Sequence, residues 1–219
     1  MAEGGIVGGA LRLLLVGATG AVGEQVLELA LAEPRIARVV APTRRPLAAH
    51  PKLDNPVLDF AQVPDRAPWW ASDAVICTLG TTIKVAGTQA NFAAVDRDLP
   101  ILFAQRARRA GAERYALNSA LGASARGNFY LRTKAEAEAG VRALGFPVYT
   151  IVRPSLIEAR RAQARPAEQA GLFVARLLRP LLPRRYRAVP ARRIAVALLD
   201  GVLRSAPGER IVESEMLQD

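Results

Sequence analysis

Hydrophobic positions in this chain fall into short unbroken runs, which alternate with longer stretches where apolar residues recur every three or four positions. The short runs are typical of buried strands, and the longer stretches are typical of helices with one buried face. This pattern predicts strands at Leu11–Val16, Ala37–Ala41, Asn55–Leu58, Asp73–Thr78, Tyr115–Ser119 and Val148–Val152. It predicts helices at Ala21–Ala32, Ala86–Val95, Ile101–Ala110, Phe129–Leu144, Ala167–Leu182 and Ala191–Leu203.

The regular exchange of strand and helix is typical of an α/β fold with a doubly wound parallel sheet and helices on both faces. We therefore expect a Rossmann fold of six or seven strands in a single domain of 219 residues. Pro34 is expected to end the first helix. Ala86–Val95 and Ile101–Ala110 are expected to lie on one long helix or on a pair broken at Pro100. The alternation weakens after Arg153-Pro154, so residues 155–219 are predicted to add a small C-terminal cap on the substrate side.

Three glycines follow the first predicted strand in the segment LLLVGATGAVGEQVLELAL, residues 13–31. Gly17, Gly20 and Gly23 lie between a strand and a helix, which is the context of a dinucleotide-binding turn. Glycine allows the tight turn and lets backbone N–H groups approach a pyrophosphate, which the helix N-terminus also attracts. The spacing is G-x-x-G-x-x-G rather than G-x-G-x-x-G, but its context predicts a bound dinucleotide.

The loop after the second predicted strand, APTRRP, contains Arg44 and Arg45 and no carboxylate. NAD sites usually place Asp or Glu here to bind the ribose 2′-OH, whereas NADP sites use arginine for the 2′-phosphate. A planar guanidinium pairs with a phosphate through two hydrogen bonds. The loop therefore predicts NADP(H) in preference to NAD(H), with two solvated loop arginines as the alternative.

Tyr130 and Lys134 are four residues apart in NFYLRTKAEAEAGV, so they project from one face of the predicted helix. An ammonium near a phenol favours the phenolate, which makes the tyrosine a usable general acid or base for a carbonyl/alcohol couple. Ser119, at the end of the preceding strand, is placed to donate a hydrogen bond to the substrate oxygen. The three residues together predict an active site.

The chain contains one cysteine, Cys77, and one histidine, His50. A single cysteine excludes an internal disulfide and fits a reducing compartment. With so few His and Cys residues no metal site is expected, and a Ser-His-Asp hydrolase would have to use His50. No apolar run is long enough to span a bilayer, and Met1–Ala10 lacks the pattern of a signal peptide. We therefore expect a cytoplasmic protein without a transmembrane segment.

The formal net charge of +10 is concentrated near the C-terminus. Between Arg153 and Arg193, eleven arginines are balanced only by Glu158 and Glu168, a local excess of +9. A solvated basic surface, an anionic substrate or cofactor, an acidic partner and an anionic membrane surface all fit this excess. Nucleic acid is not expected, because no helix-turn-helix, zinc-finger or aromatic RNA-binding pattern accompanies the charge. The apolar helices after Ala167 fit a homodimer face, a substrate lid or a membrane-surface helix.

Four segments together resemble the short-chain dehydrogenase/reductase superfamily, in its atypical NAD(P)-binding branch. GATGAVG resembles that branch's glycine turn, CTLGTT its segment after the fourth strand, and SALGAS…FYLRTKAEAE its active-site region. Arg153-Pro154-Ser155 resembles the Arg-Pro that follows its sixth strand. The resemblance extends from about Leu11 to Ile211 and is greatest to bacterial oxidoreductases similar to the Tat-interacting-protein (tumour-suppressor) group.

The resemblance implies a role for each matching residue. Tyr130 would be the catalytic acid/base, Lys134 would bind the nicotinamide ribose and assist Tyr130, and Ser119 would orient the substrate carbonyl. The implied cofactor-binding residues are Gly17, Thr19, Gly20, Val22 and Gly23 at the pyrophosphate, Arg44 and Arg45 at the 2′-phosphate, Leu79 and Gly80 at the middle of the cofactor, and Lys134, Arg153 and Pro154. The superfamily's fourth catalytic residue is an asparagine on the helix after the fourth strand, and Asn91 lies in that stretch.

These features favour an NADP-dependent oxidoreductase that transfers a hydride between the nicotinamide and a small carbonyl or alcohol substrate. A non-catalytic NADP(H)-binding regulator or redox sensor, docking a partner through its basic C-terminal third, is the main alternative. An NDP-sugar epimerase-like enzyme is the third, since it shares the turn and the Tyr-x-x-x-Lys motif. Epimerases generally carry a larger sugar-binding domain, and only 65 residues follow Pro154.

Overall fold

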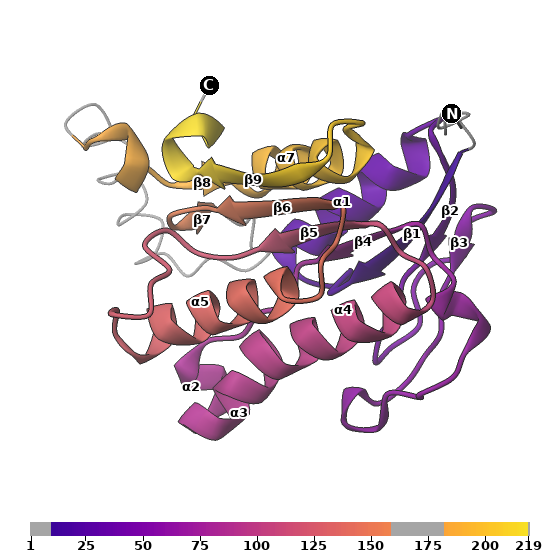
Figure 1. Cartoon of the computed structure of the whole chain (residues 1–219), viewed down its shortest axis with the longest axis horizontal. Coiled ribbons are helices and arrows are strands. Elements are labelled where there is room, and N and C mark those ends of the chain that lie inside the picture. Colours follow the sequence, from indigo (N-terminus) through magenta and orange to yellow (C-terminus); the bar gives the residue numbers. More distant parts are fainter. Residues whose placement is uncertain (1–9, 159–181, 219) are drawn as a thin grey trace, which may run out of the picture.

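A computed structural model describes residues 10–158 and 182–218 of the chain. Its strands form a seven-stranded parallel sheet in the order β3-β2-β1-β4-β5-β6-β9 (Figure 1). These strands are β1 (Leu11–Val16), β2 (Ile36–Val40), β3 (Leu53–Asp54), β4 (Ala74–Cys77), β5 (Arg114–Asn118), β6 (Val148–Arg153) and β9 (Gly208–Glu213). The strand order reverses between β1 and β4, and open α/β sheets bind ligands beyond the carboxyl ends of the strands at such a switch point.

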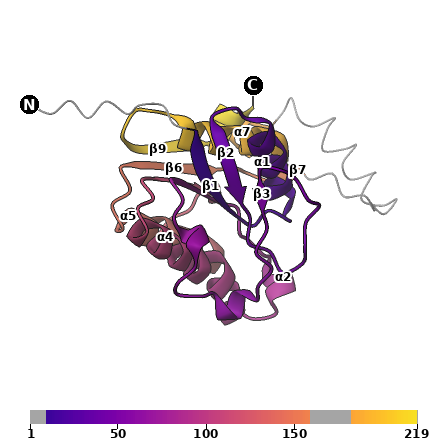
Figure 2. The same ribbon diagram turned by 90° about the vertical axis from the view of Figure 1, so that its right-hand side faces the viewer.

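Helices cover both faces of this sheet, with α1 and α7 on one face and α4 and α5 on the other (Figure 1, Figure 2). The helices are α1 (Ala21–Ala32), α2 (Ile83–Ala86), α3 (Gln89–Ala93), α4 (Leu99–Arg109), α5 (Phe129–Arg142) and α7 (Ala191–Leu203). None of the helices in the described ranges is long and apolar enough to cross a membrane. The predicted doubly wound α/β fold is confirmed.

Successive side chains of β1 pack alternately into the hydrophobic cores on the two faces of the sheet. Leu13 and Leu15 pack in the cluster that contains α1 and α7, whereas Leu14 and Val16 pack with α4 and α5. All four side chains are fully buried, because a strand covered on both faces has no solvent side. This is why unbroken apolar runs in the sequence locate the central strands.

The third strand lies earlier in the chain than the predicted Asn55–Leu58. The structure places β3 at Leu53–Asp54. Asn55 instead fixes the loop after β2, by donating from Nδ2 to the Ala41 carbonyl oxygen at 2.6 Å. Pro56 has no N–H to give to the ladder, and beyond it the pairing continues only as an isolated parallel bridge between Thr43 and Val57. The predicted position of this strand was wrong for these reasons.

The helical stretch after β4 does not break at Pro100. Pro100 is the second residue of α4, directly after a π-helical turn, and the helical backbone continues through it. The stretch divides earlier, at Gly87, which ends α2 with a φ of +77°. A π-helical turn at Ala94–Asp98 then leads directly into α4. Of the two alternatives, the long helix is confirmed from Gln89 to Arg109, and the break at Pro100 was wrong.

Residues after Arg153 contribute directly to the sheet and its covering layer. The predicted helix at Ala191–Leu203 is α7, which packs beside α1, and β9 pairs with β6 as an outer strand. Hydrophobic patterning did not predict β9, because an edge strand with the sequence GERIVE is exposed over its first half.

The remainder of the predicted cap is described only in part. β7 (Ile157–Glu158) and β8 (Val189–Pro190) form a separate two-stranded sheet. The predicted helix Ala167–Leu182 lies outside the described residues except for Leu182, as do five of the eleven arginines of the basic stretch. The cap, a homodimer face, an acidic partner and a membrane surface therefore stay predictions.

Candidate active site

The glycine turn joins β1 to α1 at the carboxyl edge of the sheet. Gly17 has a φ of +94°, a conformation that other residues rarely adopt, and a Cβ there would lie 2.7 Å from Thr78 Oγ1. A Cβ on Gly23 would collide with the Gly17 carbonyl oxygen. Glycine is therefore required at position 17 by the close approach of the segment after β4, and at position 23 by the packing of α1 against the turn.

Gly20 is different, because the backbone around it tolerates a side chain. It is the N-cap of α1 with a φ of −85°, and a Cβ there would lie 3.4 Å from the Gly17 oxygen. The Glu24 N–H donates to the Gly20 carbonyl oxygen at 2.9 Å and closes the first turn of α1. The N–H groups of the first helical residues, before Glu24, have no intrahelical acceptor, and the partial positive charge at this helix N-terminus favours a phosphate. These donors fit a dinucleotide pyrophosphate, and because Gly20 has no side chain, a phosphate can come close to them.

Arg44 and Arg45 lie in the exposed loop that follows β2. Thr43 fixes this loop by donating from Oγ1 to the Arg45 carbonyl oxygen at 2.6 Å while accepting from Asn55 Nδ2 at 2.8 Å. No ion pair in the described part of the chain involves either arginine. Both guanidinium groups are thus accessible to an anion at the end of β2, which is the strand paired with β1.

Tyr130 and Lys134 lie one turn apart on α5. The Tyr130 side chain is 37% exposed, and its ring packs against Phe92 with 5.6 Å between ring centroids. Lys134 is buried, and its Nζ lies 2.7 Å from Asp96 Oδ1. The phenol is therefore accessible to a ligand, while the ammonium is held at a fixed place in the protein.

Asp96 is a site residue that the sequence reasoning missed. It lies in the π-helical turn before α4, and its Oδ2 accepts a hydrogen bond from the Thr81 N–H at 2.8 Å. Asn91, the residue expected to act from this stretch, is exposed and donates from Nδ2 to the Ala86 carbonyl oxygen at 3.0 Å. A π-helical turn shifts the register of side chains relative to an α-helix, so helical periodicity gave no signal for Asp96.

The glycine turn and Lys134 meet through the segment that follows β4. Thr78 donates from Oγ1 to the Gly17 carbonyl oxygen at 3.1 Å. Two residues later, a Cβ on Gly80 would lie 3.8 Å from Lys134 Nζ and 3.5 Å from Asp96 Oδ1. The structure thus brings the dinucleotide turn and the Tyr130–Lys134 face of α5 to one edge of the sheet.

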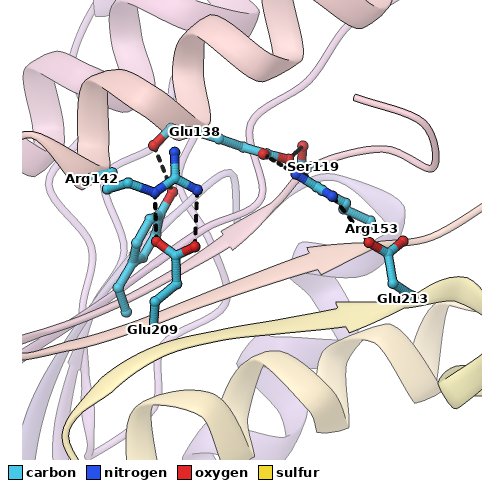
Figure 3. A network of polar contacts seen from close by, with 7 residues as sticks. Ser119, Glu138, Arg142, Arg153, Glu209 and Glu213 are labelled. Carbon is cyan, nitrogen blue, oxygen red and sulfur yellow. Dashed lines mark hydrogen bonds and ion pairs between the residues drawn. The ribbon is translucent and has the colours of Figure 1, made fainter. Parts of the chain in front are cut away.

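Ser119 is buried directly after β5, and its hydroxyl donates to Glu138 Oε1 at 2.5 Å (Figure 3). Glu138 also accepts from Arg153, whose Nε lies 2.9 Å from Oε1 and whose Nη2 lies 2.6 Å from Oε2. Arg153 Nη1 reaches Glu213 Oε1 at 3.0 Å. The hydrogen bonds to Glu138 are the main cause that raises the pKa of Arg153 above its usual value.

The other residues expected at the cofactor lie at the same strand ends. Thr19 is exposed in the glycine turn, Val22 is buried on α1, and Leu79 is half-buried after β4. Arg153 is the last residue of β6, and Pro154 follows it. Because Glu138 and Glu213 engage the Arg153 guanidinium, a cofactor contact from this segment would come from backbone atoms or from Pro154. These cofactor contacts stay predictions.

Two further polar side chains lie at the ends of β4 and β5. Asn118 Oδ1 is buried with no protein hydrogen-bond partner in the described residues, so it offers an acceptor to a bound molecule. Cys77 is fully buried, and burial raises the pKa of its thiol to about 11, which keeps it protonated near neutral pH. Within the described ranges, no group of three or more His, Cys, Asp or Glu side chains is arranged to hold a metal ion.

The fold and these strand-end residues define an oxidoreductase-like domain that binds a nicotinamide nucleotide. The sequence model of the NAD(P)H-binding family matches residues 17–174. The protein fmp52, mitochondrial, of Emericella nidulans is 36% identical over 173 residues, which are 75% of this chain and 74% of that relative. The protein HTATIP2 of Rattus norvegicus is 30% identical over 206 residues, 90% of this chain and 83% of that relative. The chain therefore belongs to the NAD(P)H-binding family, in the atypical short-chain dehydrogenase/reductase group.

Solved structures share this fold at low sequence identity. The Bordetella bronchiseptica enzyme WbmG in complex with NAD superposes with a TM-score of 0.70 at 16% identity, over 96% of this chain and 74% of that one. The reductase domain of PhqB from Penicillium fellutanum gives a TM-score of 0.65 at 18% identity, over 95% and 68% of the two chains. At such identities the likeness shows the Rossmann fold, and the family supports a nicotinamide cofactor.

The expected cytoplasmic location was wrong in the light of these relatives. The matching proteins of Emericella nidulans and Aspergillus fumigatus, at 36% and 39% identity, are both named as mitochondrial. A single buried thiol indicates a reducing environment, and the lack of a long apolar run bears only on whether the chain spans a membrane. Neither feature distinguishes one reducing compartment from another.

Proposed function

We propose that this protein is an NADP-dependent oxidoreductase that transfers a hydride between the nicotinamide and a small carbonyl or alcohol, with Tyr130 as the acid/base. The observation that carries the proposal is the position of Lys134. This buried ammonium lies beside Gly80, and the segment that contains Gly80 is hydrogen-bonded to the glycine turn through Thr78. Lys134 is also one helical turn from the accessible phenol of Tyr130.

The chain's own groups fit the cofactor along its length. The N-terminus of α1 and the glycine turn would hold the pyrophosphate, and Leu79 and Gly80 would lie at its middle. Arg44 and Arg45 would pair with the 2′-phosphate. NADP preference is supported by the exposure of both guanidinium groups, their lack of ion pairs within the described residues, and the absence of a carboxylate in their loop. When bound, the nicotinamide supplies or accepts the hydride.

Tyr130 performs the proton transfer in this proposal. Its hydroxyl gives a proton to the oxygen of a carbonyl under reduction, or takes one from an alcohol under oxidation. Lys134 lies one helical turn along α5 from Tyr130 and would bind the nicotinamide ribose. Because Asp96 binds the ammonium at 2.7 Å, Lys134 keeps one position instead of sampling several rotamers, and such fixed placement lowers the barrier to reaction.

A substrate screen tests the proposal. The full chain is incubated with NADPH and a panel of small aldehydes, ketones and quinones, or with NADP⁺ and the matching alcohols, and nicotinamide absorbance is followed. We expect turnover of at least one pair, with much less when NAD(H) replaces NADP(H). A regulator would bind NADPH without turning over any member of the panel. An epimerase-like enzyme would interconvert UDP-sugars without a net change in nicotinamide absorbance.

A further inference from the structure

Asn118 is the last residue of β5, and it lies at the level of the sheet where β1 gives way to the glycine turn. The strands β1, β4 and β5 are neighbours, and their register places Val16 opposite Cys77 and Cys77 opposite Leu117 (Figure 1). The next residue on β5, Asn118, is therefore level with Gly17, the residue after Val16. A dinucleotide held at the glycine turn would reach Asn118 by crossing a single strand, β4.

The side chain of Asn118 is buried without a partner. It is 8% exposed, and no hydrogen bond in the described part of the chain involves its amide. An amide removed from water without a hydrogen bond costs free energy, so buried amides nearly always have a partner. Val152, which is paired with Asn118 across the sheet, shows that an apolar side chain is accommodated at this level. The free Oδ1 atom therefore indicates a ligand that supplies a donor.

Asn118 and Ser119 point toward opposite faces of the sheet. Successive side chains of a strand alternate between the two faces, and Leu117 packs in the core with α4 and α5. Val152, in register with Asn118, packs in the core with α1 and α7. Ser119 instead binds Glu138 of α5. The Asn118 amide thus lies on the α1 and α7 side, away from the α5 groups assigned above to the substrate and the ribose.

We propose that Asn118 is a cofactor-binding residue that pairs with the carboxamide of the nicotinamide, its Oδ1 accepting from the NH₂ group of the ligand. The proposal rests on the proposed function, because it needs a nicotinamide nucleotide at the glycine turn. The nicotinamide end of such a cofactor has two kinds of donor, the ribose hydroxyls and the carboxamide NH₂. Lys134 on α5 is assigned to the ribose, so the carboxamide is the donor that remains for the opposite face.

The chemistry of the two groups is complementary. An asparagine amide carries one carbonyl acceptor and one NH₂ donor, and a primary carboxamide presents the same two groups in return. Pairing at the carboxamide also restricts rotation of the nicotinamide ring about its bond to the ribose. A ring held in one orientation keeps one face toward Tyr130, and such fixed placement of reacting groups lowers the barrier to reaction. Asn118 therefore favours a ring with a primary amide over an analogue with a ketone at the same place.

Binding of a cofactor analogue tests this pairing without any turnover. In 3-acetylpyridine adenine dinucleotide phosphate, a methyl group replaces the carboxamide NH₂, while the ribose, the pyrophosphate and the 2′-phosphate are kept. Isothermal titration calorimetry on the full chain gives the dissociation constants of this analogue and of NADP⁺. We expect the wild type to bind NADP⁺ about tenfold more tightly than the analogue. Asn118→Leu should bring the two constants to near equality, mainly by weakening NADP⁺.

Thr150→Val is the matched control. Thr150 is fully buried on the neighbouring strand β6, and its Oγ1 donates to the Gly201 carbonyl oxygen of α7 at 3.4 Å. This change also replaces a buried polar side chain with an apolar one on the α1 and α7 side, but away from the strand ends. We expect Thr150→Val to keep the preference of the wild type for NADP⁺ over the analogue.

Thermal melts of the protein without cofactor distinguish a ligand-binding role from a structural one. Because the Asn118 amide has no partner in the described residues, Asn118→Leu removes an unpaired buried acceptor. We therefore expect its melting temperature to equal or exceed that of the wild type. A residue with a structural hydrogen bond would show the opposite result.

The outcomes separate the role of Asn118 from the function on which it rests. Equal binding of NADP⁺ and the analogue by the wild type, or an equal loss for both ligands in Asn118→Leu, overturns the pairing and leaves the nicotinamide cofactor in place. A melting temperature of Asn118→Leu well below that of the wild type overturns it as well. If the wild type binds neither dinucleotide, the proposed function itself fails, and the role of Asn118 fails with it.

Discussion

Lys134 Nζ lies 2.7 Å from Asp96 Oδ1, and the two side chains are 8% and 1% exposed. Asp96 comes from the π-helical turn before α4, and Lys134 comes from α5. The pair therefore joins the segment after β4 to the helix that bears Tyr130. Burying two charges has a desolvation cost close to the gain from their attraction, so such a pair secures a geometry more than it adds net stability.

Replacing Asp96 with asparagine should destabilise the protein strongly. Asp96→Asn keeps the size of the side chain but leaves the Lys134 ammonium buried without a counter-charge, and breaking a buried pair in this way costs about 3–5 kcal/mol. Urea unfolding measures the loss. The control is Glu28→Gln, which removes an exposed pair with Arg192 whose side chains are 62% and 54% exposed, and should change stability by less than about 1 kcal/mol. Equal effects of the two substitutions would contradict the structural role of Asp96.

The glycines of the turn should separate into two classes on substitution. Gly23→Ala places a Cβ against the Gly17 carbonyl oxygen and should lower the melting temperature markedly. Gly20→Ala leaves its Cβ at 3.4 Å from the same atom, so the fold should tolerate it while NADPH affinity falls about tenfold or more through loss of close phosphate approach. Thermal melts and NADPH fluorescence titrations measure the two effects. Undiminished NADPH binding by a folded Gly20→Ala protein would place the pyrophosphate elsewhere.

The two arginines after β2 should determine the choice of cofactor. Arg44→Ser with Arg45→Ser removes two accessible guanidinium groups, and hydrogen bonds to charged groups contribute about 1.5–3 kcal/mol each. NADPH affinity should therefore fall at least about tenfold, while NADH affinity stays nearly unchanged. Competitive fluorescence titration measures both constants. Arg66→Ser, at an exposed position in another loop, is the control and should leave both affinities as they are.

The protein should lose stability as the pH rises above about 9. Burial raises the pKa of Cys77 from 9.0 to about 11 and also raises the pKa values of Tyr115 and Tyr149 above the usual 10.0. The unfolded chain releases these protons first, so it binds fewer protons than the folded state and the free energy of unfolding falls with rising pH. Each group contributes up to about 1.4 kcal/mol per pH unit between its unfolded and folded pKa values.

Urea midpoints measured from pH 8 to pH 11 test this dependence. Cys77→Ala removes the thiol's contribution and should flatten the decline between pH 9 and about 11. Tyr149→Phe should flatten it only above pH 10. A stability that stays constant across this range would show that these three groups are not buried as the structure places them.

Local patterns in the sequence predicted the elements that are buried or capped locally. The apolar run of β1, the glycines beside it and the four-residue spacing of Tyr130 and Lys134 each reflect contacts within a short segment. β9 was not predicted, because its place at the sheet edge depends on pairing with β6 and its residues are largely polar. The charged partners were missed for a similar reason. Asp96 reaches Lys134 only through a π-helical turn, and Glu138 meets Ser119 only once β5 and α5 pack together.

The proposed reaction depends on the phenol of Tyr130 as its acid/base. The most direct measurement compares Tyr130→Phe with the wild type in two assays, NADPH dissociation constant and turnover number with the best substrate of the screen. General acid–base catalysis contributes about 10²–10⁴-fold, so turnover should fall by at least about 100-fold. The dissociation constant should stay within about threefold, because the hydroxyl acts in the transition state. Turnover that survives in Tyr130→Phe with unchanged cofactor binding would contradict the assignment of Tyr130 as the acid/base.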